Sequence, residues 1–291
     1  MDEVMNKAVE RERYRLVNDA AQVVRNLAGD TPRPLVVVTG TGLAALADVL
    51  SIGRRIAASA VPNLPCPAVA GHSGEIVLGR LGPLEAIVFA GRVHVYEGFR
   101  ASETAFAVNL GSQLGGKILL ATNAAGGVNP QLLPGDLMML TNHINLTFRN
   151  PLVGCKDRNR LATSRQWAGN PYDGQLCDMM REAARREKIN LKEGVYAYNL
   201  GPTYETRAEA AMLGEIGVDA VGMSTVAEVI AARRAGMRTV AISCIANRVP
   251  VWGKPQTLTH REVIERVGKA VERLKPLVVQ WAKLVAENAS H

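Results

Sequence analysis

Short apolar runs alternate with longer amphipathic segments along most of the chain. The runs are bounded by Gly, Pro, Asn or Asp. Several of these runs are continuously apolar, as strands are when helices cover both faces of their sheet. The pattern therefore predicts an α/β fold. The runs that fit strands are Leu35–Val38, Ala86–Phe89, Ile118–Ala121, Leu137–Leu140, Val195–Leu200, Ala220–Met223 and Thr239–Ile245.

Apolar residues at helical spacing predict the segments that cover this sheet. An N-terminal helix over residues 5–27 ends before Gly29. A C-terminal helix over residues 260–288 starts at a capping box of Thr259 and Glu262 and is expected to kink at Pro276. The other predicted helices are Glu103–Leu114, Tyr172–Lys188, Arg207–Ile216 and Ala227–Ala235.

The length and uniform organisation of the chain favour a single domain. No repeat, linker or low-complexity tract interrupts residues 1–291, and 47% of the residues are hydrophobic, which suffices for a sizeable core. We expect one mixed, twisted β-sheet flanked by helices, with both terminal helices packed on it. The polar segment Thr147–Pro171 lacks periodicity and is expected to be a long loop, which is uncommon unless the loop is functional or disordered.

Composition excludes several classes of protein. No apolar run reaches the ~18 residues of a membrane-spanning helix, and the charged start does not form a signal peptide, so we expect a cytoplasmic protein without a membrane partner. The four cysteines lie far apart without metal-ligand spacing, which predicts reduced thiols and no metal. The net charge of +7 is spread through helices, which favours a basic surface that draws in phosphate over nucleic-acid binding.

The segment from Gly201 to Glu228 carries the strongest indication of a site. Gly201-Pro202 ends a predicted strand, and a capping box of Thr206 and Glu209 starts a helix, so Glu205 lies in the turn between them. Ligands of open α/β sheets bind outside the carboxyl ends of the strands, where this carboxylate would face a substrate. The alternative is a surface glutamate stabilised by the helix dipole.

A glycine-containing segment has the chemistry of a phosphate site. Gly40-Thr41-Gly42 follows a predicted strand and precedes a helical run, so backbone N–H groups and a hydroxyl can meet phosphate oxygens. With Ala45 the segment also satisfies a loose dinucleotide fingerprint. That fingerprint expects an acidic residue about 20 positions on, and none stands between Asp48 and Glu75, which weakens an oxidoreductase interpretation.

Further residues fit the same anion site. Arg92 and His94 alternate on an extended segment, so both side chains can face one anion, and a guanidinium matches phosphate geometry. An isolated pair of this kind more often lies on the surface of an edge strand. Ser224, in a turn after a strand, and the backbone N–H of Ala124 complete the predicted anion site.

Five ordered motifs resemble the signature segments of the trimeric purine nucleoside phosphorylases, which cleave 6-oxopurine nucleosides with inorganic phosphate. The resemblance extends from about Leu35 to about Val267. The motifs are Gly40–Leu43, Gly71–Gly74 with Gly91–Gly98, Thr122–Gly127, Gly201–Thr206 and Val221–Val229.

The resemblance implies a role for each candidate residue. Asn247, Glu205 and His94 would be catalytic, since a donor from Asn247 to N7 stabilises the purine as charge develops on it. Inorganic phosphate would be a co-substrate, and no cofactor is expected. The implied ligands are Thr41, His72, Arg92, His94, Ala124 and Ser224 for phosphate, Tyr96, Met223 and His260 for ribose, and Tyr204, Glu205 and Asn247 for the base.

The chain departs from the family pattern in three places. Thr41 and Ala44 stand where Ser and Gly are commoner, and Ala246 replaces the usual Thr before Asn247. The family also forms a homotrimer in which an aromatic residue from the loop completes a neighbouring site. No Phe falls cleanly at that place, and the candidates are Phe148, Trp167 and Tyr172.

Three alternatives to a phosphorylase of inosine and guanosine stay open from the sequence. The first is a phosphorylase for methylthioadenosine or xanthosine, which would differ in the pockets for the base and the 5′ group. The second is a nucleotide-binding oxidoreductase built on Gly40-Thr41-Gly42. The third is a purine-binding module without turnover, if Ala44, Ala246 or the altered loop disables catalysis.

Overall fold

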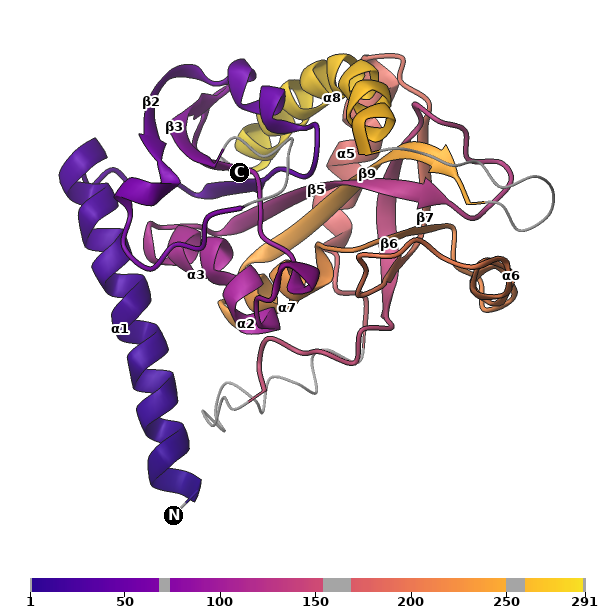
Figure 1. Cartoon of the computed structure of the whole chain (residues 1–291). Coiled ribbons are helices and arrows are strands. Elements are labelled where there is room, and N and C mark those ends of the chain that lie inside the picture. The colour runs from indigo at the N-terminus through magenta and orange to yellow at the C-terminus, as the bar shows by residue number, and fades with distance from the viewer. Residues whose placement is uncertain (1, 68–73, 154–168, 250–259, 290–291) are drawn as a thin grey trace.

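The computed structural model describes residues 2–67, 74–153, 169–249 and 260–289. Within these ranges nine strands form one mixed sheet, in the order β2-β3-β4-β1-β5-β8-β7-β6-β9 (Figure 1). The strands are β1 (Leu35–Val38), β2 (Ser51–Ala57), β3 (Glu75–Leu81), β4 (Leu84–Ala90), β5 (Ile118–Gly127), β6 (Leu137–Asn145), β7 (Leu191–Tyr198), β8 (Ala220–Gly222) and β9 (Arg238–Arg248).

The last strand closes part of the sheet on itself. β9 pairs parallel with β5 and antiparallel with β6, so β5, β8, β7, β6 and β9 follow one another around a ring. β8 runs antiparallel to the end of β5, with Val221 opposite Gly126. This pairing brings the segment that follows β8 beside the last residues of β5, although the two strands run in opposite directions.

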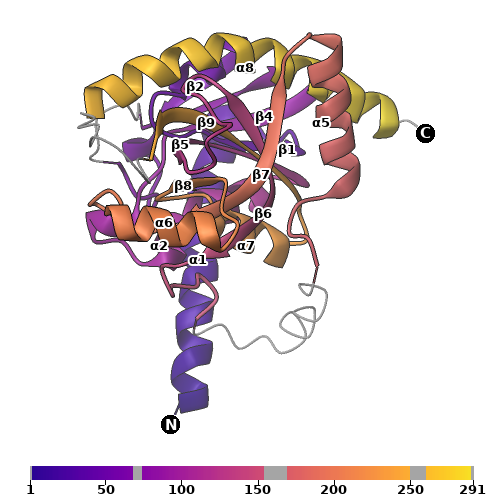
Figure 2. The same ribbon diagram turned by 90° about the vertical axis from the view of Figure 1, so that its right-hand side faces the viewer.

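Helices cover the sheet in two groups (Figure 2). α5 and α8 pack against each other, and α8 also contacts β9 and β4. On the other side, α3 and α7 contact each other and the strands β1, β5 and β9. The helices are α1 (Asp2–Ala28), α2 (Ala101–Thr104), α3 (Phe106–Gln113), α5 (Gly174–Arg186), α6 (Arg207–Glu215), α7 (Val226–Arg234) and α8 (His260–Ala289), with 3₁₀ helices η1 (Ala44–Val49), η2 (Ala58–Ala60) and η3 (Val95–Glu97).

Both terminal helices pack on the rest of the protein through apolar faces. Val17, Ala20 and Val24 of α1 are buried, and the helix packs on α3 while its first turns extend away from the sheet (Figure 1). In α8, Trp281 is fully buried, and its Nε1 donates to the backbone oxygen of Leu176 in α5 at 3.1 Å. No helix in the described ranges is long and apolar enough to cross a membrane.

The α/β class and the mixed sheet are confirmed, but the sequence missed the antiparallel edge formed by β2 and β3. In β2, Arg54 and Arg55 interrupt the apolar pattern, and both follow Gly53, where the β2–β3 register shifts. The predicted helix Glu103–Leu114 is also divided, because α2 ends at Thr104 and α3 begins at Phe106. The helical run expected after Gly42 is the short 3₁₀ helix η1.

A β-bulge interrupts the pairing of β5 with β9. Ala125 lies opposite Ile245, whereas Gly126 lies opposite Asn247, so Ala246 is an extra residue without a partner in the ladder. The backbone oxygen of Ala246 accepts from Nη1 of Arg266 in α8 at 3.4 Å. Bulges bend a strand and change the direction of the side chains that follow them. This bulge sets the orientation of Asn247.

Candidate active site

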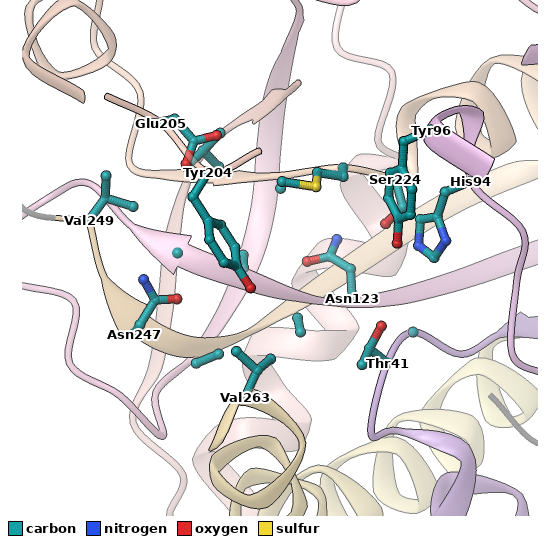
Figure 3. A pocket seen from close by; sticks show the side chains of 18 residues that line it. Thr41, His94, Tyr96, Asn123, Tyr204, Glu205, Ser224, Asn247, Val249 and Val263 are labelled. Carbon is teal, nitrogen blue, oxygen red and sulfur yellow. The ribbon is translucent and has the colours of Figure 1, made fainter. Parts of the chain in front are cut away.

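A pocket lies where the segments after β1, β7, β8 and the end of β9 meet the last residues of β5. Nine of the residues selected from the sequence line it together: Thr41, His94, Tyr96, Ala124, Tyr204, Glu205, Met223, Ser224 and Asn247. The pocket has two ends (Figure 3). Glu205, Asn247 and Val249 lie at one end, and Ser224, His94 and Thr41 lie toward the other, with Asn123 between them.

Two glycines allow these segments to approach closely. Gly201 has φ +71°, and a Cβ there would lie 2.4 Å from Sδ of Met223, so the turn after β7 packs directly on this side chain. A Cβ on Gly126 would lie 2.6 Å from Cγ2 of Val249 and 3.5 Å from Nδ2 of Asn247. A side chain at either position would therefore displace residues that line the pocket.

His94 is fixed by a carboxylate next to it. Its Nδ1 lies 2.8 Å from Oε1 of Glu97, which also accepts from the His94 backbone N–H at 2.8 Å. With Nδ1–H donating, the neutral ring presents Nε2 as an acceptor, and the protonated ring presents it as a donor. The ring stacks on Tyr96 with centroids 4.7 Å apart. Partial burial, helped by the nearby Glu97 charge, raises the pKa of Tyr96 to about 12, so its phenol stays neutral.

Ser224 is presented by a strained turn. The backbone N–H of Val226 donates to the oxygen of Ser224 at 2.9 Å, and Thr225 between them has φ 78° and ψ −46°. This is a γ-turn with a β-branched residue in the left-handed region, which is a costly conformation. Asn123 supports it, because its Nδ2 donates to Oγ1 of Thr225 at 2.9 Å while its Oδ1 accepts from Ser243 at 2.8 Å.

Arg92 does not line this pocket, contrary to the expectation that it and His94 face one anion. Its side chain is 2% exposed. Nη1 donates to Oγ of Ser224 at 2.8 Å, and Nη2 donates to the backbone oxygens of Val38 and Thr122 at 3.1 and 2.7 Å. The guanidinium lies behind Ser224 because it binds the buried backbone oxygens of Val38 and Thr122. Alternation along the extended segment therefore did not decide its direction.

A carboxylate and an amide occupy the other end of the pocket. Oε1 of Glu205 accepts from Nδ2 of Asn199 at 2.7 Å, and the Asn199 backbone N–H donates to the oxygen of Gly222 in β8. One carboxylate oxygen is thus held by the protein, which leaves Oε2 for a ligand. Nδ2 of Asn247 lies 3.2 Å from the backbone oxygen of Arg248. Tyr204 is 55% exposed, and partial burial raises the pKa of its phenol.

The comparisons with known proteins agree with this geometry. The model of a family described as the phosphorylase superfamily matches residues 34–282. The chain belongs to this superfamily. It is 39% identical over 272 residues to purine nucleoside phosphorylase 1 of Geobacillus stearothermophilus, which covers 94% of this chain and 97% of the relative. The purine nucleoside phosphorylase of Rattus norvegicus is 38% identical over 253 residues, covering 84% and 87%.

Solved structures give the same assignment. The purine nucleoside phosphorylase of Schistosoma mansoni in complex with inosine superposes with a TM-score of 0.82 at 31% identity, covering 92% of this chain and 95% of that chain. The same protein has been solved in complex with adenosine, also with a TM-score of 0.82. The resemblance seen in the motifs is confirmed, and the chain is a pentosyltransferase of the purine nucleoside phosphorylase family.

Several predicted residues lie outside what the structure describes. His72 and Trp167 fall in the undescribed segments 68–73 and 154–168, and the side chain of His260, the first residue of α8, is not described either. Of the aromatic candidates for a neighbouring site, Tyr172 is buried in its own chain, where its hydroxyl lies 3.1 Å from Nδ1 of His143. Phe148 is 91% exposed.

The sequence also missed residues that line this phosphorylase pocket. Asn123 lies inside a motif that was recognised, but only the backbone of its neighbour Ala124 was assigned a role. Val249 and Val263 are apolar residues without a chemical signal, and only the fold brings them to the pocket. Within the described ranges, no group of three or more His, Cys, Asp or Glu side chains is arranged to hold a metal ion.

Proposed function

We propose that this enzyme is a phosphorylase of 6-oxopurine nucleosides, with inosine and guanosine as substrates. Inorganic phosphate attacks C1′, the C1′–N9 bond breaks with its electron pair going to the base, and the products are ribose 1-phosphate and the free purine. The observation that carries the proposal is the two-ended pocket, with Glu205 and Asn247 at one end and Ser224, His94 and Thr41 at the other.

The base end favours a purine with a hydrogen on N1. Because Oε1 of Glu205 is held by Asn199, Oε2 can accept from N1–H of hypoxanthine or guanine and from the 2-amino group of guanine. Asn247 would donate to N7 as the base leaves, where negative charge develops. Tyr204 would cover the ring. Adenine presents a lone pair at N1, which repels the carboxylate.

The other end has donors for phosphate. Thr41, His94, Ala124 and Ser224 all line the pocket, and their hydroxyls, imidazole ring and backbone N–H would bind one anion together. Arg92 would add positive charge from beneath Ser224. His72 is assigned to phosphate from the resemblance, and no cofactor takes part in the proposed reaction.

The ribose would lie between the two ends. Tyr96 and Met223 line the pocket, and both lie close to Gly201 in the turn after β7. His260 is assigned to the 5′-hydroxyl from the resemblance. A sugar in this position has C1′ between the base and the anion, which is the arrangement that direct displacement by phosphate requires.

A phosphorolysis assay tests the proposed function. Inosine, guanosine, xanthosine, adenosine and methylthioadenosine are incubated with enzyme, with and without phosphate, and both base and ribose 1-phosphate are measured. We expect phosphate-dependent cleavage of inosine and guanosine with kcat/KM at least about a hundredfold above that for adenosine. A preference for methylthioadenosine or xanthosine would contradict the substrate assignment. Binding of hypoxanthine without any product would contradict turnover.

We also propose that the enzyme is a homotrimer. The family resemblance supports this assembly, and the exposed ring of Phe148 is suited to a protein interface because an aromatic side chain buries a large area there. Sedimentation at micromolar concentration should give about three times the chain mass of 31.2 kDa. A fully active monomer would contradict the proposal. A cytoplasmic location and a role in purine salvage stay predictions.

A further inference from the structure

A buried ion pair lies behind the phosphate end of the pocket. Nε of Arg92 is 3.2 Å from Oε1 of Glu228, and the two side chains are 2% and 3% exposed. Neither residue lines the pocket. Withdrawing two charges from water is unfavourable unless close pairing and additional hydrogen bonds compensate. A pair that served only to stabilise the fold could be replaced by apolar side chains, so its contacts indicate what else it does.

The contacts of Arg92 converge on the turn that presents Ser224. Nη1 donates to Oγ of Ser224 and to Oγ1 of Thr225, both at 2.8 Å. Nη2 donates to the backbone oxygen of Val38, the last residue of β1, and to that of Thr122, which lies within β5. The guanidinium therefore ties the turn after β8 to two strands that contribute their own ends to the site.

Glu228 holds this guanidinium from the helix that the same turn starts. It lies in the first turn of α7, three residues after Thr225. Burial raises the pKa of the Glu228 carboxyl, and the Arg92 charge opposes that rise. A cavity of about 10 Å³ adjoins Glu228, Thr225 and Tyr198, so the pair has little room to rearrange without losing contacts.

The turn needs such support because its conformation is strained. Thr225 has φ 78° and ψ −46°, and residues in such conformations persist only when their surroundings over-determine them. Its Oγ1 accepts from both Arg92 and Asn123. If Arg92 shifts, Thr225 loses one of these donors and the Ser224 hydroxyl loses its bond from the guanidinium.

We propose that Glu228 is a positioning residue for phosphate: by pairing with Arg92 it holds the guanidinium against Ser224 and Thr225, so that the turn presents its donors to the anion. The inference rests on the proposed function and adds to it a residue outside the pocket. The alternative is a pair that only stabilises the fold.

The test replaces Glu228 with glutamine, which keeps the volume and removes the charge. In Glu228→Gln, the KM for phosphate should rise about tenfold, and the KM for inosine should change less than twofold. Phosphate binding without nucleoside, measured as the phosphate-dependent rise in Tm, should weaken in parallel. A merely structural role would lower the Tm without separating the two KM values.

A control variant removes the charge from a second ion pair, which is partly buried. Oδ1 of Asp173 lies 2.7 Å from Nη2 of Arg238, which is the first residue of β9 and therefore at the opposite end of that strand from Asn247. Asp173→Asn should lower the Tm and leave both KM values unchanged. It therefore shows what loss of stability alone does to the kinetics.

A double variant tests whether Glu228 acts through Arg92. If it does, the phosphate KM of Arg92→Gln with Glu228→Gln should equal that of Arg92→Gln alone, because the second change has nothing left to position. Additive effects would overturn the inference, as would an unchanged phosphate KM or tighter phosphate binding in Glu228→Gln. Phosphate that raises the wild-type Tm without any turnover would overturn only the proposed function, and the Tm series would still decide the role of Glu228. If phosphate neither raises the wild-type Tm nor supports turnover, both the proposed function and the role of Glu228 are overturned.

Discussion

Replacing Glu205 with glutamine should reduce the preference of the enzyme for inosine over adenosine. Oε1 of Glu205 accepts from Nδ2 of Asn199 at 2.7 Å, and the same bond in the variant would hold the amide oxygen on Asn199. The amide NH₂ would then face the base. This NH₂ group would repel N1–H of hypoxanthine, because both are donors, but it would donate to the N1 lone pair of adenine.

The magnitude follows from the bond that is lost. A hydrogen bond to a charged group contributes about 1.5 to 3 kcal/mol. At about 1.36 kcal/mol for each factor of ten, kcat/KM for inosine should fall about 10- to 150-fold. The value for adenosine should stay the same or rise, so the ratio between the two substrates should fall by at least the same factor. Steady-state rates at saturating phosphate, followed by the change in ultraviolet absorbance, measure both.

Two further variants make this test specific. Glu215, exposed at the end of α6, provides a control in which glutamine removes a charge away from the pocket and should change neither rate. With Asn199→Ala added to Glu205→Gln, the amide is free to turn its oxygen to the base, and part of the inosine activity should return. An equal loss for inosine and adenosine, or no recovery in the double variant, would refute the assignment of Oε2 to the base.

Three other outcomes are expected. Asn247→Asp should narrow the gap between inosine and adenosine in kcat/KM, because a carboxyl group there can accept from the 6-amino group; an unchanged ratio in an active variant would exclude Asn247 as a base reader. Thr225→Val leaves two buried donors without their acceptor and should lower the free energy of unfolding in urea by about 2 to 4 kcal/mol, whereas Thr225→Ser should stay within about 1 kcal/mol. Burial lowers the pKa of His143 to about 4, so the folded state binds fewer protons than the unfolded state, and stability should fall as pH decreases from about 6.5 toward 4. In His143→Gln that fall should be smaller by up to roughly 3 kcal/mol at pH 4, and equal pH profiles of unfolding would contradict the assignment.

The sequence predicted those features that depend on local pattern. The apolar runs of β1, β5 and β9 were recognised because strands that are buried on both faces consist mostly of apolar residues. The capping box of Thr206 and Glu209 located the start of α6, and hence Glu205, since its bonds form between neighbouring residues. The edge strand β2 was missed because it pairs on one side only and carries charges.

The features that depend on distant contacts could not be predicted. Arg92 was expected in the pocket, but its direction is decided by the oxygens of Val38 and Thr122, which no pattern in the chain connects to it. The sequence did not indicate a role for Asn199, because Glu205 was expected to bind only the purine and no protein partner for its carboxylate was considered. Asn123 and Val249 reach the pocket only because β9 closes the sheet against β5.

The bulge at Ala246 makes base recognition depend on the register of β9, as well as on which residues it contains. Side chains alternate between the two faces of a strand, so a ladder that stayed regular past Ile245 would put Ala246 opposite Gly126 and turn Asn247 to the opposite face. Such a regular strand would keep every proposed ligand of the base in its sequence and still be unable to bring Asn247 to N7. Transfer of this site to another sheet protein would therefore have to include an irregularity in the backbone, and a comparison of relatives by residue identity alone would overlook it.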